Sequence, residues 1–216
     1  MRDWGFGTRR VADTKALRCG PGRRPALFPN PSSFIPPMHR IILFRGMNTG
    51  GVRAPVAEQR AMAVEMGLAN PRTLLASGNL VVDSDRDPRS LEAEVEAAME
   101  RRFGLTLAAV VRTPEQWAGL IAANPFPDEG KAAPSKLLVM LMKDGIRPGA
   151  LEALRAVAGP GERVEPADGA LFFWHPEGIG RSKLAEKAQP RLIGVGTGRN
   201  WNTVLRLAEM VGLPSR

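Results

Sequence analysis

The sequence is poor in the residues from which covalent cross-links and metal sites are built. It holds one cysteine, Cys19, and two histidines, His39 and His175, in 216 residues. A single cysteine excludes a disulfide within the chain and a multi-cysteine metal site. The two histidines lie far apart, without the spacing of a zinc motif, so we expect no metal site. The shortage of cysteine fits a cytoplasmic protein.

Long apolar runs are also missing. No stretch approaches the roughly 20 apolar residues that a membrane span needs, and the longest uncharged apolar run, 137–142, is typical of a buried strand. The uninterrupted apolar stretch of a secretory signal is absent too. Hydrophobic residues make up 44% of the chain, enough for the core of one large domain or two small ones. We expect a soluble protein with no membrane partner.

Positive charge is in excess, but it is unevenly distributed. Residues 1–37 hold seven basic and two acidic residues, so they contribute +5 of the net +8. This segment is rich in Arg, Pro and Gly and lacks periodicity, which predicts a disordered basic tail. An Arg-rich tail can contact nucleic acid or steer a partner. The alternative, which we favour, is an over-long start, with Met38 as the true first residue.

After the tail, the sequence predicts an α+β fold in two halves, 38–113 and 114–216. In the first half the expected elements are a strand at 40–44, a helix at 55–67, a hairpin or bent strand at 73–82, a helix at 87–104 and a strand at 107–111. The face expected to be buried on the first helix is Ala57, Ala61, Val64 and Leu68. This order is the split β-α-β pattern of ferredoxin-like folds, with antiparallel sheets and helices on one face.

The second half is expected to repeat that order without a clear last strand. Thr113–Gln116 is a capping box that opens a short helix, and Asp168-Gly169 is a tight-turn signal between two strands. The expected elements are a strand at 137–142, a helix at 151–158, the hairpin, and helical segments near 181–192 and 202–211. The last of these helices is expected to have Asn202 or Thr203 as its N-cap.

Three glycine-containing segments are candidates for binding an anion. The first is 45–51, where Arg45, Asn48, Gly50 and Gly51 follow a strand; the alternative is a tight turn. The second is 178–184, where Arg181, Ser182 and Lys183 begin a helix; the alternative is a solvated turn. The third is 196–203, which holds Arg199, Asn200, Trp201 and Asn202. Trp201 can stack on a base, although burial in the core is the favoured interpretation.

Charge within the body supports an anionic partner. Residues 178–206 hold six basic residues and one acid, so their net charge is +5, whereas the rest of the body is at −2. Such segregation is typical of a surface that meets an anion, although a charged run is often only a soluble face. We therefore expect any anion to lie between the helix starts near Ser182 and Asn202. The body contains neither a Gly-x-Ser-x-Gly elbow nor a Cys-His pair, so no known catalytic motif points to a reaction.

The same segments resemble a bacterial family called domain of unknown function 1697. The resemblance rests on residues 42–51, 77–79, 124–127, 178–184 and 197–204. The chain departs from the family's usual pattern at Met47, and it lacks the aromatic residue that tends to lie near Leu75; it contains no tyrosine at all. The resemblance implies two α-β plaits and a start near Met38, and it implies no activity; the sequence leaves the cofactor unknown.

The leading functional hypothesis is the binding of a phosphate-containing small molecule, such as a nucleotide or sugar phosphate, or of nucleic acid. Ser77 and Asn79 complete the predicted site. The alternative is a protein-interaction or self-assembly module in which these motifs are caps and turns. The two differ in whether the motifs share a cleft.

Overall fold

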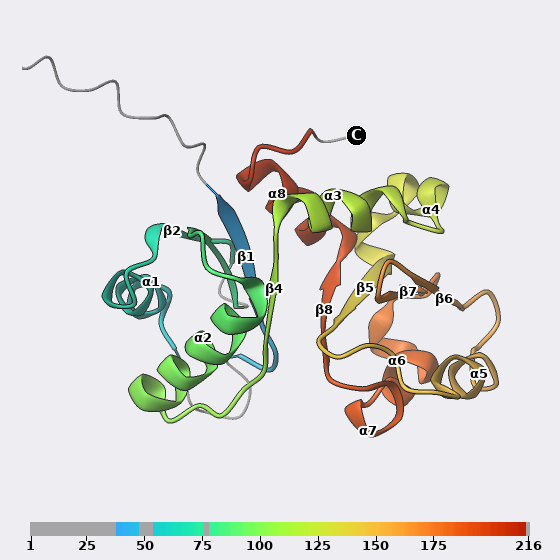
Figure 1. Ribbon diagram of the computed structural model, residues 1–216. Coiled ribbons are helices and arrows are strands. Elements are labelled where there is room, and N and C mark those ends of the chain that lie inside the picture. Colours follow the sequence, from blue (N-terminus) through green and yellow to red (C-terminus); the bar gives the residue numbers. More distant parts are fainter. Residues whose placement is uncertain (1–37, 48–53, 76–77, 215–216) are drawn as a thin grey trace, which may run out of the picture. The chain divides into compact units, whose positions relative to one another are not determined.

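The computed structural model describes residues 38–47, 54–75 and 78–214 (Figure 1). These residues belong to one compact unit, 36–216. Its first half contains β1 (His39–Phe44), α1 (Val56–Glu65), β2 (Ala69–Thr73), β3 (Asn79–Asp83), α2 (Pro88–Phe103) and β4 (Ala109–Arg112). Its second half contains α3 (Pro114–Ala122), α4 (Pro127–Ala132), β5 (Leu137–Met142), α5 (Ala150–Arg155), β6 (Arg163–Ala167), β7 (Ala170–Trp174), α6 (Lys183–Lys187), α7 (Pro190–Ile193), β8 (Gly196–Asn200) and α8 (Trp201–Met210).

The strands form two antiparallel sheets with the same relative order. The first sheet runs β2-β3-β1-β4, and the second runs β6-β7-β5-β8. In each sheet the first strand of the half lies in the interior, between the third and the fourth. The predicted α+β class is therefore confirmed.

Alternation along the strands divides the core into three clusters. Ile41 and Leu43 of β1, together with Val139 of β5, belong to a central cluster that both sheets share with α3 and α8. The intervening Ile42 and Phe44 pack with α1 and α2 in a second cluster. A third cluster joins the other face of the second sheet to α5, α6 and α7. Because side chains alternate with period two, each sheet has one face on its own helices and one on the shared core.

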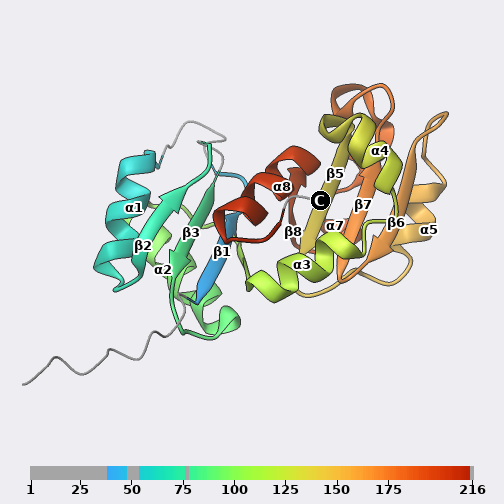
Figure 2. The same ribbon diagram turned by 90° about the horizontal axis from the view of Figure 1, so that it is seen from above.

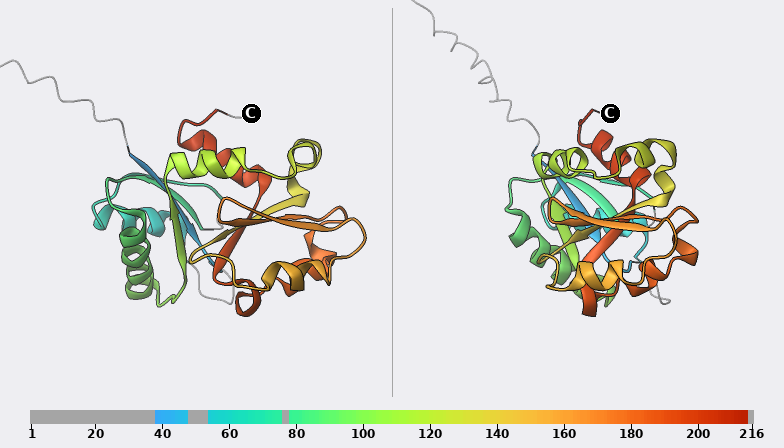
Figure 3. Two further views of the ribbon diagram at one scale, coloured as in Figure 1. Left: turned by 45° about the vertical axis from the view of Figure 1, so that its right-hand side comes forward. Right: turned by 90° about the vertical axis from the view of Figure 1, so that its right-hand side faces the viewer.

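Helices α3 and α8 hold the shared core together. They lie side by side above the two sheets in Figure 3, and in the view from above they span the junction of the sheets (Figure 2). Trp117 of α3 is fully buried, and its indole Nε1 donates to the backbone oxygen of Val204 in α8 at 3.0 Å. A buried indole N–H needs such an acceptor, so this bond fixes how the two helices meet.

Local signals placed several boundaries correctly. Asp87 caps α2 by accepting from the Ser90 N–H, and Gly104 ends that helix in the left-handed region. Thr113 and Gln116 form both bonds of the predicted capping box. Asp168 and Gly169 both have positive φ, as a primed two-residue turn requires, and they join β6 to β7.

The segment before the last helix was predicted wrongly. Residues 196–200 form β8, which pairs with β5 from Gly196 opposite Met142 to Asn200 opposite Leu138. The second half therefore has the last strand that its sequence did not indicate. The N-cap of α8 is Asn200, not Asn202 or Thr203, because the Asn200 side chain accepts from the Thr203 N–H and hydroxyl, both at 2.9 Å.

Two helix predictions also need correction. The segment expected as one helix at 181–192 is divided into α6 and α7, since Pro190 has no N–H with which to continue a helix. On α1 the buried residues are Gln59, Met62 and Ala63, whereas Val64 is 60% exposed. The buried face is rotated because the Gln59 side chain turns inward and donates to the Ala54 carbonyl at 2.7 Å.

Two features are absent from the described residues. Within 38–47, 54–75 and 78–214, no helix has the length and apolar character needed to cross a membrane. In the same ranges, no group of three or more His, Cys, Asp or Glu side chains is placed to hold a metal ion.

Candidate functional site

Three of the sequence motifs meet at the guanidinium group of Arg199. Its Nε donates to the Asn79 side chain, and Nη1 donates to the Thr197 hydroxyl at 2.7 Å and the Gly198 carbonyl at 2.8 Å. Its Nη2 donates to the carbonyls of Phe44 and Gly78, both at 3.0 Å. Arg199 on β8 therefore joins the second sheet to the ends of β1 and β3 in the first.

Burial gives the Arg199 cluster a structural role. Arg199 is 8% exposed and Asn79 is fully buried. Removal from water disfavours the charged form and lowers the pKa of Arg199 to about 10. The hydrogen bonds above engage all five guanidinium N–H groups with neutral acceptors of the protein itself. Parts of three motif segments, 42–51, 77–79 and 197–204, thus meet, but on a buried hydrogen-bonded cluster and without the 178–184 motif that the binding hypothesis also required in one cleft.

The remaining residues of the first predicted segment, and Ser77, are placed as follows. Asn48, Gly50, Gly51 and Ser77 lie outside the described residues. Arg45 is exposed and borders a surface hollow of about 620 Å³ together with Lys143.

The second predicted segment, 178–184, lies apart from the Arg199 cluster. Ser182 caps α6 by accepting from the Ala185 N–H at 2.9 Å. Lys183 borders a hollow of about 650 Å³ in which Lys187, Arg191 and Glu186 also take part. Arg181 is exposed at the end of a short 3-10 turn, Ile179–Arg181.

The start of α8 is at the opposite end of β8 from α6 and α7 (Figure 1). Trp201 is 6% exposed, and its ring lies 6.3 Å from that of Phe172, centroid to centroid, which agrees with the favoured core interpretation. Asn202 is exposed on the first turn. The helix starts near Ser182 and Asn202 therefore do not face one hollow.

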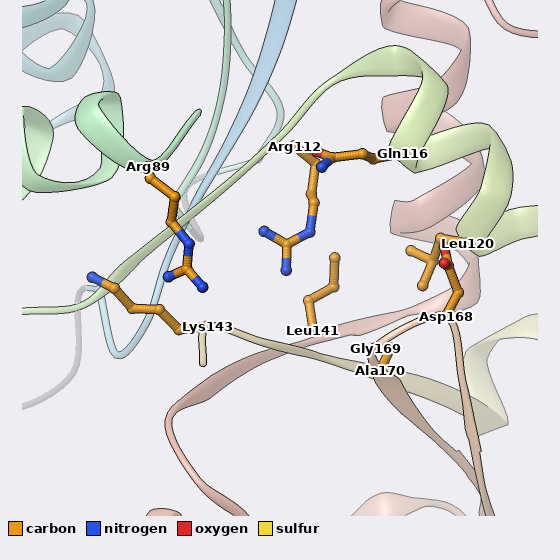
Figure 4. A pocket seen from close by; sticks show the side chains of 9 residues that line it. All are labelled: Arg89, Arg112, Gln116, Leu120, Leu141, Lys143, Asp168, Gly169 and Ala170. Carbon is orange, nitrogen blue, oxygen red and sulfur yellow. The ribbon is translucent and has the colours of Figure 1, made fainter. Parts of the chain in front are cut away.

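A cationic pocket lies where the two halves meet, and we call it the junction pocket. It has a volume of about 360 Å³ and is lined by Arg89, Arg112, Gln116, Leu120, Leu141, Lys143, Asp168, Gly169 and Ala170 (Figure 4). The guanidinium groups of Arg89 and Arg112 extend into the same space in Figure 4, and Asp168 lies across from them. Such a volume is within the range of small-ligand sites, which often lie at the junction of two structural units.

The two arginines share one buried carboxylate. Glu92 is 2% exposed; its Oε1 accepts from the Val111 N–H at 2.9 Å and lies 3.7 Å from Nη1 of Arg112. Its Oε2 accepts from Arg89 at 3.4 Å. Arg89 also binds Asp144, at 2.9 Å.

Burial, chiefly, lowers the pKa of Arg112; Glu92 opposes the shift, and the charge of Arg89 adds to it. The effect of Arg89 means that the two guanidinium groups repel each other. Arg112 is anchored by bonds to the carbonyls of Val111 and Met142, at 2.8 and 2.7 Å, so it cannot move away without losing them. An anion between the groups would relieve this repulsion.

Comparison with protein families identifies the chain's relatives. The model of a family described as "Protein of unknown function (DUF1697)" matches residues 38–172. The chain belongs to the DUF1697 family. The match covers the first three resembling segments and ends before the two at 178–184 and 197–204. It agrees with the family that the sequence motifs suggested.

One solved structure resembles this DUF1697 protein over most of its length. It is the conserved bacterial protein SP0830 from Streptococcus pneumoniae, with 17% identity and a TM-score of 0.67. The likeness covers 81% of the present chain and 98% of the other. At this identity it shows a shared fold alone. Among curated proteins, none matches the chain.

The junction pocket of this DUF1697 protein was missed from the sequence. Its charged groups come from a helix start, a strand end and the residue after a strand: Arg89, Arg112 and Lys143. No glycine-rich loop or short motif joins them. One signal was present in the sequence: a basic residue stands at the end of the buried strand β4 (Arg112) and just after the buried strand β5 (Lys143). Functional residues often lie at such positions, where the chain leaves the core.

Proposed function

We propose that this protein binds a small phosphorylated or nucleotide-like anion in the junction pocket. The observation that carries the proposal is the convergence of the Arg89 and Arg112 guanidinium groups on one space. The acids that pair with the lining cations are Glu92, Glu96 and Asp144, and none of them lines the pocket. A phosphate group would therefore meet the guanidinium groups directly, with Asp168, the acid in the lining, on the opposite side of the pocket.

The rest of the lining favours a small ligand with polar groups. Asp168 and Gln116 offer acceptors for hydroxyl or amino groups, as a sugar phosphate or nucleotide carries. No aromatic side chain lines the pocket, whereas proteins that bind single-stranded nucleic acid stack bases on aromatic rings. A mononucleotide or sugar phosphate is thus a better fit than an oligonucleotide.

The test is calorimetric titration with inorganic phosphate, pyrophosphate, ribose 5-phosphate and AMP, against wild-type protein and Arg89→Gln. The Arg89 side chain is 60% exposed, so its loss should leave the fold intact. Affinity for the best ligand should fall at least about tenfold, because a charge-assisted bond contributes roughly 1.5–3 kcal/mol. Arg60→Gln, an exposed arginine on α1, is the matched control and should bind as wild type.

Two results would remove the proposal. One is a wild-type protein that binds none of the four ligands. The other is a loss of affinity in Lys187→Gln with none in Arg89→Gln, which would place the anion in the hollow at α6 and α7. Raising the salt concentration should weaken anion binding both in the junction pocket and in the hollow at α6 and α7, so the salt dependence alone does not distinguish the two sites.

The alternative of a self-assembling module has less support. One outer strand of the first sheet, β2, contains Pro71 and an irregular register beside Asn70, which has positive φ. One outer strand of the second sheet, β6, contains Pro166. Proline and bulges protect sheet edges from pairing with another chain. We therefore expect no assembly through β2 or β6, which light scattering after gel filtration would measure.

We further propose that each half is a ferredoxin-like plait. The element order and the strand order support this, since each half runs β-α-β-β-α-β, with α6 and α7 sharing the place of the second helix in the later half. An experimental structure in which either half has a different strand order would contradict it.

A further inference from the structure

A second cavity, separate from the junction pocket, lies on the outer side of α3. It has a volume of about 480 Å³ and is lined by Ala118, Ile121, Ala122, Asn124, Pro127, Lys131, Trp201, Leu213 and Pro214. We call it the α3 cavity. None of these residues lines the junction pocket, so the two sites can be tested independently.

The C-terminal turns of α3 are apolar on the side of the cavity as well as on the side of the core. Trp117 and Leu120 face the shared core and Ile121 packs against it, while Ala118, Ile121 and Ala122 line the cavity. The exposed polar residues of the helix, Glu115 and Gln116, lie in its first turn and do not line the cavity. The two alanines leave a hollow, and Ile121 is only half-buried. The lining from α3 is therefore suited to an apolar group.

The walls of the α3 cavity are held in place by close packing. Gly130 of α4 lies against Trp201 and Asn124: a Cβ there would come within 3.2 Å of the indole Nε1 and 3.1 Å of the amide Nδ2. Asn124 is fixed as well, since its Oδ1 accepts from the Phe126 N–H at 2.9 Å. The cavity is thus formed before any ligand arrives, which reduces the entropy cost of binding.

The charge of the lining is of one sign. Lys131 is exposed at the end of α4, and no acidic side chain lines the cavity. The nearby Glu129 is directed elsewhere, because it pairs with Arg163, whose guanidinium lies 4.8 Å from the centre of the Phe126 ring. An apolar hollow in which the described residues supply one cation and no acidic side chain is complementary to a molecule with an apolar body and a negative head.

We propose that the α3 cavity binds a small apolar carboxylate. The carboxylate would pair with the Lys131 ammonium group, and the hydrocarbon or aromatic body would lie against Ile121, Ala122 and Leu213. The proposal does not depend on the junction pocket.

The experiment measures octanoate binding by calorimetry, with 1-octanol as the neutral ligand of equal chain length. Octanoate should bind wild-type protein saturably and should lose about tenfold in affinity in Lys131→Gln. Octanol should bind both proteins equally, because it has no charge to pair. Lys187→Gln, which removes an exposed lysine outside the cavity, should leave octanoate binding unchanged.

A filling variant separates the cavity from the rest of the surface. Ala118→Leu should abolish binding of both ligands while leaving phosphate binding and the circular dichroism spectrum as in wild type. Should that variant fail to fold, Lys131→Gln still decides, since its side chain is exposed. Absence of saturable octanoate binding, or affinity retained in Lys131→Gln, overturns the proposal. So does a dimer that dissociates in Ile121→Asp, because a second chain would then be the occupant.

Discussion

The Arg199 cluster and the junction pocket both place guanidinium groups between the two sheets, but they use them differently. Arg199 is 8% exposed and engages its N–H groups with neutral acceptors of the protein. The side chains of Arg89 and Arg112 are 60% and 24% exposed and share a carboxylate. Burial thus decides whether an arginine stabilises the fold or is accessible to a ligand. The more distinctive sequence motif marks the structural arginine.

The largest expected effect is on stability, from Arg199→Leu. The change removes five hydrogen bonds from a buried site, each contributing roughly 0.5–1.5 kcal/mol, while the Gly78 and Phe44 carbonyls keep bonds from the Phe44 N–H and the Thr197 hydroxyl. We expect a loss of about 3–5 kcal/mol in the free energy of unfolding, measured by urea denaturation. Arg89→Gln should change it by less than about 0.5 kcal/mol. Similar losses in the two variants would break the comparison.

Asn79→Ala sharpens the account of the Arg199 cluster. It removes the acceptor of the Arg199 Nε and a donor to the Leu74 carbonyl at 2.9 Å, so we expect a loss of about 1–3 kcal/mol. Combined with Arg199→Leu, the losses should be less than additive, because the two side chains act on one bond. Full additivity would show that the cluster does not act as a unit.

Arg112→Lys tests an arginine whose exposure, 24%, lies between those of Arg199 and Arg89. A lysine keeps the charge but cannot reproduce the forked geometry that reaches the Val111 and Met142 carbonyls together. We expect about 1–2 kcal/mol of lost stability, together with weaker phosphate binding in the same variant. A variant that binds phosphate as wild type would assign Arg112 to the fold alone.

His175 extends the comparison to a buried base whose hydrogen bonds are incomplete. It is 1% exposed; Nδ1 lies 3.3 Å from Glu162, and Nε2 has no partner in the described part of the chain. Burial lowers the pKa of His175, and Glu162 only partly opposes the shift. The unfolded chain therefore binds this proton more readily, so stability should fall as the pH drops through about 6.5.

The measurement is urea unfolding between pH 7.5 and pH 5, on wild type and His175→Phe. The variant should lose the downward slope, whatever its absolute stability. Glu162 acts in a different window: burial raises its pKa, but bonds from Ser182, the Gly159 N–H and His175 lower it below 4.5 overall. The stability that ionised Glu162 contributes to the fold is thus lost only below about pH 4.5, outside the range of this measurement. An equal slope in both proteins would assign the pH dependence to other groups.

The sequence predicted elements whose signals are local and failed where tertiary pairing decides. The caps of α2 and α3 were predictable because a side chain bonds the backbone three residues away. Strand β8 was not, since Gly-Thr-Gly-Arg-Asn has little β-propensity and forms a strand through its pairing with β5. The short α4 was not predicted at all.

The same division holds for the sites. The motif residues Asn79 and Arg199, predicted to bind a ligand, do meet in the structure, but their burial could not be inferred from spacing. Arg89 and Arg112 are separated by α2 and β4 and share no motif. They meet because both contact Glu92, which is buried on α2. Arg112, the last residue of β4, lies 3.7 Å from its carboxylate.

The shared core has a consequence for synthesis on the ribosome. The first sheet is complete once Arg112 has been made, but its face bearing Ile41, Leu43 and Val110 still lacks a cover. Helix α3, which packs against β1, follows directly, but α8, the other helix of the shared core, comes after every strand of both sheets along the chain. A nascent first half therefore keeps part of this apolar surface exposed until translation has passed Met210, and during that interval it is prone to aggregate.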